Sequence, residues 1–260
     1  MGWLRLRQIC LAAPHVELCT QALQALLDVS ECHRDPAVAA YGLENILFPI
    51  GADRFLEVVC PTAPGAETAA GRFLQTSRGR GGYMLIFDCD DPAARAAHAT
   101  EAGVRLAHHI DHDHYQGYQL HPRDCRACFL EFDHTKGGED PSAAYAPAGP
   151  GWQAHIRTRT TKALLGVEIL SPDPAELAAH WSHLLQIPAQ PRADGAWTLQ
   201  VEAQQIAILP APGLERERLD ALRLSVEGAA EILARARYLG FETSEDAFRL
   251  AGMRFRLIEA

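Results

Sequence analysis

Hydrophobic and polar positions along the chain repeat one arrangement four times: a short apolar strand pattern, an amphipathic helix pattern, and then further strand patterns. The expected helices span residues 16–27, 92–104, 174–187 and 229–241. The strands expected before them span residues 6–15, 82–91, 164–173 and 219–228. The strands expected after them span residues 43–51 and 54–61, 117–122 and 127–133, 196–203 and 204–212, and 247–252 and 253–260. The pattern predicts an α+β chain of four β-α-β-β-β modules.

Local start signals support two of these helices. Asp91 precedes Pro92, and Asp173 precedes Pro174, at the expected starts of the second and third helices. A short acid accepts hydrogen bonds from the first backbone N–H groups of a helix, and proline fits the first helical turn because it has no N–H to satisfy. The repeat therefore agrees with the local sequence as well as with the periodicity.

The composition changes after Asp133, where the chain reads HTKGGEDPSAAYAPAGPGWQ. A stretch rich in glycine, proline and alanine is typical of a linker or of a segment that wraps around a domain. The chain of 260 residues is long enough for one large domain or for two. We expect a first domain over residues 1–135, a linker or wrapping segment over 136–160, and a second domain over 161–260.

Charge and cysteine usage exclude several classes of partner. The formal net charge of −9 argues against nucleic acid, whose binders carry a concentrated basic face. Apolar runs fall short of the ~20 residues of a membrane helix, and the N-terminus has too short an apolar core for a secretion signal, so we expect a cytoplasmic protein. The seven cysteines are an odd number and are expected to be reduced. Cys125 and Cys128 form a CxxC pair, for which packing is favoured over zinc because residues i and i+3 of a strand face opposite ways.

Two stretches resemble the vicinal oxygen chelate superfamily, which contains glyoxalase I, methylmalonyl-CoA epimerase, extradiol dioxygenases and the bleomycin-resistance proteins. HPRDC at 121–125, followed by FLEF at 129–132, is similar to the "HPKD…ELE" stretch of the epimerases, and FLEVVCP at 55–61 is similar to "YLELLEP". The module pattern extends the resemblance over nearly the whole chain, as in bacterial glyoxalase-like proteins with two such domains. The resemblance implies two glyoxalase-like domains, in which paired modules curl into a cup with helices outside and a ligand cavity inside.

Two glutamates occupy the strands that carry the resemblance. Strand alternation places Glu131 on one face with Phe129 and Asp133, and Glu57 on the corresponding face of residues 54–61. If the cup closes as the resemblance implies, both carboxylates point into one cavity, where they need a cation, a shared proton or water. Taken singly, each glutamate is also explained as an acid on an edge strand that reaches solvent.

In the family, the first and last strands of each module each send one side chain to a divalent metal. Matching the pattern implies a Mg, Mn, Zn or Fe ion held by Gln8, Glu57 and Glu131, with Met84 at the remaining position. Gln8 has an amide oxygen to offer, whereas a thioether is a poor ligand for a hard ion, so Met84 is expected to be cavity wall. Histidine is missing from the matched positions, which favours a metal-free cavity over a bound catalytic metal.

Further substrate contacts are expected from residues near these strands. His121 lies in the matched motif and is a candidate acid/base or substrate contact at the cavity mouth. Glu44 and Asn45 are candidates for lining the cup, although they are equally explained as polar strand residues. Tyr83 and Met84 would give the cavity an apolar wall.

The histidine-rich stretch at 108–114 and the second domain carry weaker signals. His108, His109, His112 and His114 fall at a strand end and in an Asp-rich turn, where adventitious surface binding is favoured over a built metal site. The second domain has Gly166 or Val167 and Arg256 at the matched positions, and Arg256 would repel a cation. We expect a degenerate copy, with Arg256 as an alternative contact for an anionic substrate.

These observations support a glyoxalase-like protein that binds a small molecule, as an isomerase, epimerase or lyase on a substrate with neighbouring oxygens. Glu131 or Glu57 would act as the proton-shuttling base and Gln8 as a ligand or orienting amide. The alternative from another class is a non-catalytic sequestering protein of the bleomycin-resistance type. A purely structural pseudo-symmetric dimer is a third reading, and edge-strand pairing in the family makes a homodimer an expectation.

Overall fold

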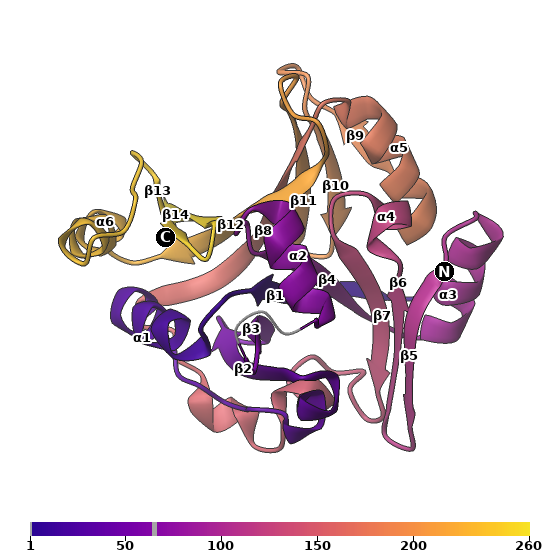
Figure 1. Ribbon diagram of the computed structural model, residues 1–260, viewed down its shortest axis with the longest axis horizontal. Coiled ribbons are helices and arrows are strands. Elements are labelled where there is room, and N and C mark those ends of the chain that lie inside the picture. Colours follow the sequence, from indigo (N-terminus) through magenta and orange to yellow (C-terminus); the bar gives the residue numbers. More distant parts are fainter. Residues whose placement is uncertain (1, 64–66) are drawn as a thin grey trace. The chain divides into compact units, whose positions relative to one another are not determined.

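The computed structural model describes residues 2–63 and 67–260, and within them it shows four modules of strands and helices (Figure 1). The first module contains β1 (Leu4–Ala12), α1 (Val16–Leu27), β2 (Leu43–Ile50) and β3 (Arg54–Pro61). The second contains β4 (Gly82–Cys89), α3 (Pro92–Glu101), β5 (Leu106–His112), β6 (Tyr115–Leu120) and β7 (Phe129–Thr135). The third contains β8 (Thr161–Ser171), α5 (Pro174–Leu185), β9 (Ala189–Pro191), β10 (Trp197–Val201) and β11 (Gln204–Pro210). The fourth contains β12 (Arg218–Val226), α6 (Ala229–Tyr238), β13 (Ala247–Leu250) and β14 (Met253–Glu259).

Two mixed seven-stranded sheets hold these strands. Their strand orders are β2-β3-β1-β4-β7-β6-β5 and β13-β14-β12-β8-β11-β10-β9. In every module the first strand pairs in parallel with the last strand, and the strands between them pair antiparallel. The predicted α+β architecture of four modules is confirmed, with one difference: three strands follow the helix in the second and third modules, but two in the first and fourth.

The helix signals in the sequence are also confirmed. Asp91 accepts a hydrogen bond from Ala94 N at 2.8 Å, and Asp173 accepts one from Glu176 N at 3.0 Å. Helix α1 has the predicted bounds, whereas α3 and α6 end about one turn before the predicted ends. These helices end early because Gly103 and Gly240, which follow them, adopt φ angles of 88° and 84°, and a right-handed helix does not contain such angles.

By compactness the chain forms two units that are not consecutive in sequence. We call residues 8–83, 145–164 and 221–260 the outer-module unit, because they hold most of the first and fourth modules. Residues 1–7, 84–144 and 165–220 form the inner-module unit, which holds most of the second and third modules. The domain boundaries at 135 and 161 stay a prediction.

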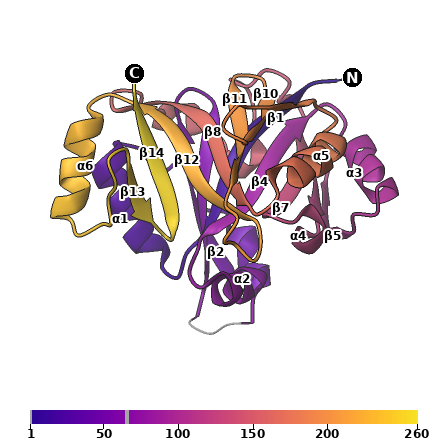
Figure 2. The ribbon, with the colours of Figure 1, turned by 90° about the horizontal axis from the view of Figure 1, so that it is seen from above.

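In the outer-module unit, helices α1 and α6 lie side by side (Figures 1 and 2), and Arg235 Nη1 donates to Ala25 O at 2.7 Å. A hydrophobic core of the same unit combines residues of β2 and β3 with residues of the expected linker. It consists of Leu47, Phe55, Tyr145, Ala148 and Trp152. Tyr145 and Trp152, in the expected linker, are therefore packed into this core, and that residues 136–160 form a linker or wrapping segment stays a prediction.

In the inner-module unit, α3 and α5 pack together (Figure 2), with the rings of His98 and His183 4.8 Å apart. The short helix α4 (Pro122–Cys125) in the HPRDC stretch is fixed by α5, since Trp181 Nε1 donates to Cys125 O at 2.8 Å. The seven cysteines, which all lie in the described residues, form no disulfide, and both members of the CxxC pair are buried, as the packing interpretation predicted. Among residues 2–63 and 67–260, no helix has the length and apolar character needed to cross a membrane.

Candidate functional site

Glu57, on β3, is held between two side-chain amides in the outer-module unit. Gln8 Nε2, on β1, donates to Glu57 Oε2 at 2.9 Å, and Asn45 Nδ2, on β2, donates to Glu57 Oε1 at 2.7 Å. These three strands are neighbours in the sheet, and the register pairs Gln8 with Phe55 and Asn45 with Val59, so the three side chains share one face. Glu57 therefore shares a face with Phe55, as strand alternation predicted, and that this face lines a cavity stays a prediction.

The oxygen of each amide accepts a hydrogen bond from another residue, and this bond fixes the orientation of the amide. Asn45 Oδ1 accepts a hydrogen bond from the backbone N–H of Asp35 at 2.9 Å, and Gln8 Oε1 accepts one from the Tyr145 hydroxyl at 3.1 Å. Because a backbone N–H can only donate, the Asn45 oxygen must face Asp35 and its NH2 group must face Glu57. Tyr145 is stacked on Phe55 with ring centroids 4.8 Å apart. Tyr145 was not predicted as a site residue, because it lies in a segment without periodicity.

Glu57 is half-buried, and its pKa is raised. Loss of hydration is the main cause, and hydrogen bonds from Asn45, Cys10 and Gln8 oppose it because they favour the charged form. Burial also raises the pKa of Tyr83, with smaller contributions from Cys10 and Glu57. The charge of Glu57 therefore disfavours ionisation of Tyr83.

The residues around Glu57 do not fit the divalent ion that the resemblance implies. The oxygen of Gln8, its only ligand atom for a hard metal, is engaged by Tyr145, and the NH2 groups of Gln8 and Asn45 point at the carboxylate. In the described residues there is no group of three or more His, Cys, Asp or Glu side chains arranged to hold a metal. The Glu57 carboxylate is therefore surrounded by hydrogen-bond donors, whereas a site for a divalent cation is built from oxygen ligands.

Glu131, on β7, lies in the inner-module unit and is only 2% exposed. The Tyr115 hydroxyl is 2.8 Å from Glu131 Oε1 and 3.1 Å from Asp133 Oδ2, so the two acids share a face, as alternation predicted. The register pairs Asp133 with Asp88 on β4. Burial raises the pKa of Asp133 well above its ordinary value, and the charges of Asp88 and Glu131 raise it further. That Glu57 and Glu131 converge on one cavity stays a prediction.

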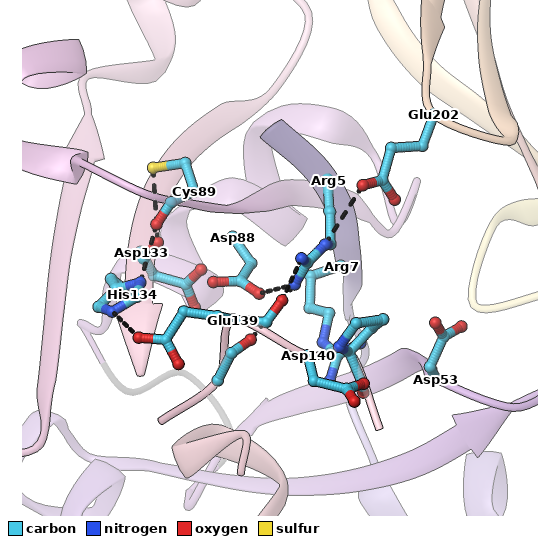
Figure 3. Close-up of polar contacts among 12 residues, drawn as sticks. Arg5, Arg7, Asp53, Asp88, Cys89, Asp133, His134, Glu139, Asp140 and Glu202 are labelled. Atoms are coloured by element: carbon cyan, nitrogen blue, oxygen red, sulfur yellow. Dashed lines mark hydrogen bonds and ion pairs between the residues drawn. The ribbon is translucent and has the colours of Figure 1, made fainter. Parts of the chain in front are cut away.

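Two arginines of β1 approach this group of acids from the start of the chain (Figure 3). Arg5 contacts Asp88 at 3.3 Å and Glu202 at 3.3 Å, and it also donates to the carbonyls of Gly138 and Glu139. Arg7 Nη2 donates to the carbonyl oxygen of Pro141 at 2.7 Å. The arginines therefore hold the backbone at 138–141 as well as compensating buried negative charge.

The other predicted contact residues occupy different environments. Tyr83 and Met84 are each 6% exposed, and Tyr83 meets Phe73 edge-to-face with centroids 5.0 Å apart. Glu44 is exposed and lies on the face of β2 opposite to Asn45, so it does not join the Glu57 group. His121 caps α4 by accepting from Arg123 N at 3.3 Å, which gives it a local structural role.

The residues with weaker signals in the sequence also have structural explanations. His108, His109 and His112 lie within β5 rather than at a strand end and in a turn, and the His112 and His114 rings are 6.1 Å apart on the surface. A Cβ at Gly166 would lie 1.9 Å from Gln205 O, so this position has no room for a ligand side chain. Arg256 is paired with Asp246.

The module order and the parallel pairing of first and last strands define a glyoxalase-like, or vicinal oxygen chelate, fold. The chain is similar to a hypothetical protein from Staphylococcus aureus, with a TM-score of 0.68, 11% identity and 99% of each chain covered. It is also similar to the Mn(II)-bound glyoxalase from Novosphingobium aromaticivorans, with a TM-score of 0.66 and 13% identity over 100% of this chain and 83% of that one. Methylmalonyl-CoA epimerase of Streptomyces coelicolor matches 50% of this chain and 94% of its own, with 21% identity and a TM-score of 0.45. The chain matches no protein-family model and no curated protein sequence.

Proposed function

We propose that this protein binds a small organic molecule and that Glu57 exchanges a proton with it, in an isomerase, epimerase or lyase reaction. One observation carries the proposal: a half-buried carboxyl is oriented by two amide donors, each of which is fixed from behind. Such an arrangement places a base without needing the protein to reorganise during the reaction.

The proposed chemistry follows from the raised pKa of Glu57 and from the hydrogen bonds that hold its carboxylate. Its raised pKa makes the ionised carboxylate a stronger base than an exposed glutamate. The NH2 groups of Gln8 and Asn45 hold the carboxylate in place while it takes a proton from a carbon next to a carbonyl group, and the electron pair of the broken C–H bond moves onto the carbonyl oxygen to form an enolate, which is reprotonated at carbon. A substrate with two neighbouring oxygens suits this step, because the second oxygen provides a further point of attachment. Glu131 is a weaker candidate for the base, since it is buried against Tyr115.

We predict that Glu57→Gln slows this proton exchange about 10²–10⁴-fold, the range for loss of a general base. The measurement is proton–deuterium exchange in D2O, followed by NMR, with a panel of 2-oxo acids, 2-hydroxy ketones and thioesters. Glu44→Gln is the matched control, because Glu44 is exposed on the neighbouring strand and its loss should leave the rate unchanged. Exchange at the wild-type rate in Glu57→Gln, or no exchange with any member of the panel, would reject the catalytic role.

A second candidate function is non-catalytic binding. The edge-to-face pair of Tyr83 and Phe73 favours it, because these aromatic side chains offer apolar contacts without a reactive group. We expect a planar aromatic ligand to raise the melting temperature under this function, since a ligand stabilises only the state that it binds. A thermal-shift screen distinguishes the two, because a binding protein would respond equally in Glu57→Gln while showing no exchange.

A further inference from the structure

We infer that the amides of Gln8 and Asn45, locked by Tyr145 and by the Asp35 backbone, exclude a divalent cation from Glu57 and keep the site for ligands that donate hydrogen bonds. This inference goes beyond the proposed function, since it makes no demand on turnover. It concerns which ligands the Glu57 carboxylate can bind, and it disagrees with the expectation from the fold resemblance that Glu57 binds a divalent metal.

The geometry at the carboxylate carries the first step. Both oxygens of Glu57 already face an NH2 group, at 2.9 Å and 2.7 Å. A divalent ion would have to lie about 2.0–2.6 Å from one of these oxygens, next to hydrogens that carry partial positive charge. The ion would also lack the oxygen ligands that normally complete its shell. An O–H or N–H donor of a ligand, in contrast, extends the existing pattern of hydrogen bonds.

The second step concerns rotation of the amides, which would turn their oxygens toward an ion. For Asn45 this rotation would place an NH2 group against the backbone N–H of Asp35, so two donors would face each other. For Gln8 it would break the hydrogen bond from the Tyr145 hydroxyl. The Asn45 change leaves the Asp35 N–H without this acceptor, and the Gln8 change leaves the Tyr145 hydroxyl able only to accept from Gln8, so both are unfavourable.

The third step concerns Tyr145, which is a positioning residue because it acts through Gln8. Tyr145 is 2% exposed and is stacked on Phe55, within the core that also contains Leu47, Ala148 and Trp152. The hydroxyl therefore cannot move away from Gln8 without disturbing this core. A segment that the sequence marks as a linker thus determines the ligand preference of a strand residue.

The test measures Mn²⁺ binding to chelator-treated protein by electron paramagnetic resonance, without substrate. We expect no stoichiometric binding at Glu57 in the wild type. Asn45→Asp keeps an oxygen for Asp35 N but places a second carboxylate against Glu57, and it should raise Mn²⁺ affinity at least about tenfold, since carboxylate count sets the affinity of such sites. Adding Glu57→Gln to this variant should remove the gain. Gln75→Glu, at an exposed position of α2 (Ala69–Ser77), is the control with the same charge change.

Tyr145→Phe provides a second route that adds no charge. It frees the Gln8 amide to turn its oxygen toward an ion, so we expect a smaller gain in Mn²⁺ affinity, with a circular dichroism spectrum that confirms folding. Stoichiometric Mn²⁺ binding by the wild type that is lost in Glu57→Gln would overturn the inference. So would two folded variants, Asn45→Asp and Tyr145→Phe, that both bind Mn²⁺ as weakly as the wild type.

Discussion

Replacing Trp152 by alanine should lower the free energy of unfolding by about 3–5 kcal/mol, the usual cost of truncating a buried aromatic side chain. Trp152 is 1% exposed, and its ring meets Phe55 edge-to-face with centroids 5.0 Å apart. Phe55 is in turn stacked on Tyr145. The substitution therefore removes one of three aromatic rings that pack against the face of the sheet that carries Glu57, and the surroundings can fill the space only in part.

Urea unfolding, followed by tryptophan fluorescence and circular dichroism, measures this effect. Trp152→Phe should recover part of the loss because it keeps an aromatic ring in the core. Tyr238→Ala is a control of similar size change, and it should be nearly neutral because Tyr238 is 90% exposed. If Trp152→Ala loses less than about 1 kcal/mol, then residues 145–156 are a loosely attached linker, and Tyr145 cannot hold Gln8 as we infer.

The fold was predictable because its signals are local and repeated. Each of the four predicted helices has an apolar stripe, and Asp91 and Asp173 mark two helix starts. Strand alternation also predicted that Glu131 and Asp133 share a face, which the shared contact with Tyr115 confirms. Periodicity predicts which face of a strand a residue occupies, because the alternation of faces depends only on the sequence of that strand.

The missed elements are those with little burial or little length. Helix α2 has nine residues and buries only Ala70 and Gly71, so it is short and shows little burial. Strand β5 is largely exposed and reads LAHHIDH, and its histidines look like a turn because their polar side chains hide the strand. Strand β9 has three residues. In each case, pairing with a neighbouring strand or contact with the sheet decides the structure, and the local sequence does not show it.

The candidate site was predicted in its residues but not in its contacts. Gln8, Asn45 and Glu57 are all among the residues selected from the sequence, yet Gln8 was expected to present its oxygen to a metal. The direction of the Gln8 amide depends on Tyr145, which lies 137 residues away in the chain. No pattern within a strand carries that information, because it arises from tertiary packing of a segment without periodicity.

Asp133→Asn should make the folded protein more stable at alkaline pH, by about 1–3 kcal/mol, the penalty for a buried polar group without a full set of partners. Asp133 is fully buried, and its Oδ1 has no hydrogen-bond partner among the described residues. The neighbouring Asp88 and Glu131 add like charge. Asparagine keeps the shape of the side chain and the acceptor for Tyr115, and it replaces a like charge by an NH2 group facing the other acids.

The pH dependence distinguishes this effect from a simple change in packing. Burial, Asp88 and Glu131 raise the pKa of Asp133, so the folded chain keeps a proton that the unfolded chain has released. The stability from this proton is complete below the ordinary aspartate pKa of about 3.9 and is lost as pH rises toward the pKa of the folded state. The advantage of Asp133→Asn over the wild type should therefore be small near pH 4 and grow toward pH 8.

Asp124→Asn is the matched control, because its effect on stability at neutral pH should be opposite in sign to that of Asp133→Asn. A hydrogen bond from Arg105 lowers the pKa of Asp124 to about 2, so its stabilising effect is present above the ordinary aspartate pKa and lost as pH falls. Urea unfolding at pH 4, 6 and 8 should therefore show Asp124→Asn below the wild type at neutral pH and Asp133→Asn above it. A variant Asp133→Asn that is less stable than the wild type at pH 8 would mean that the ionised carboxylate is held by Arg7 strongly enough to outweigh its burial. In that case the acids on β4 and β7 are a compensated ion network rather than a destabilising cluster.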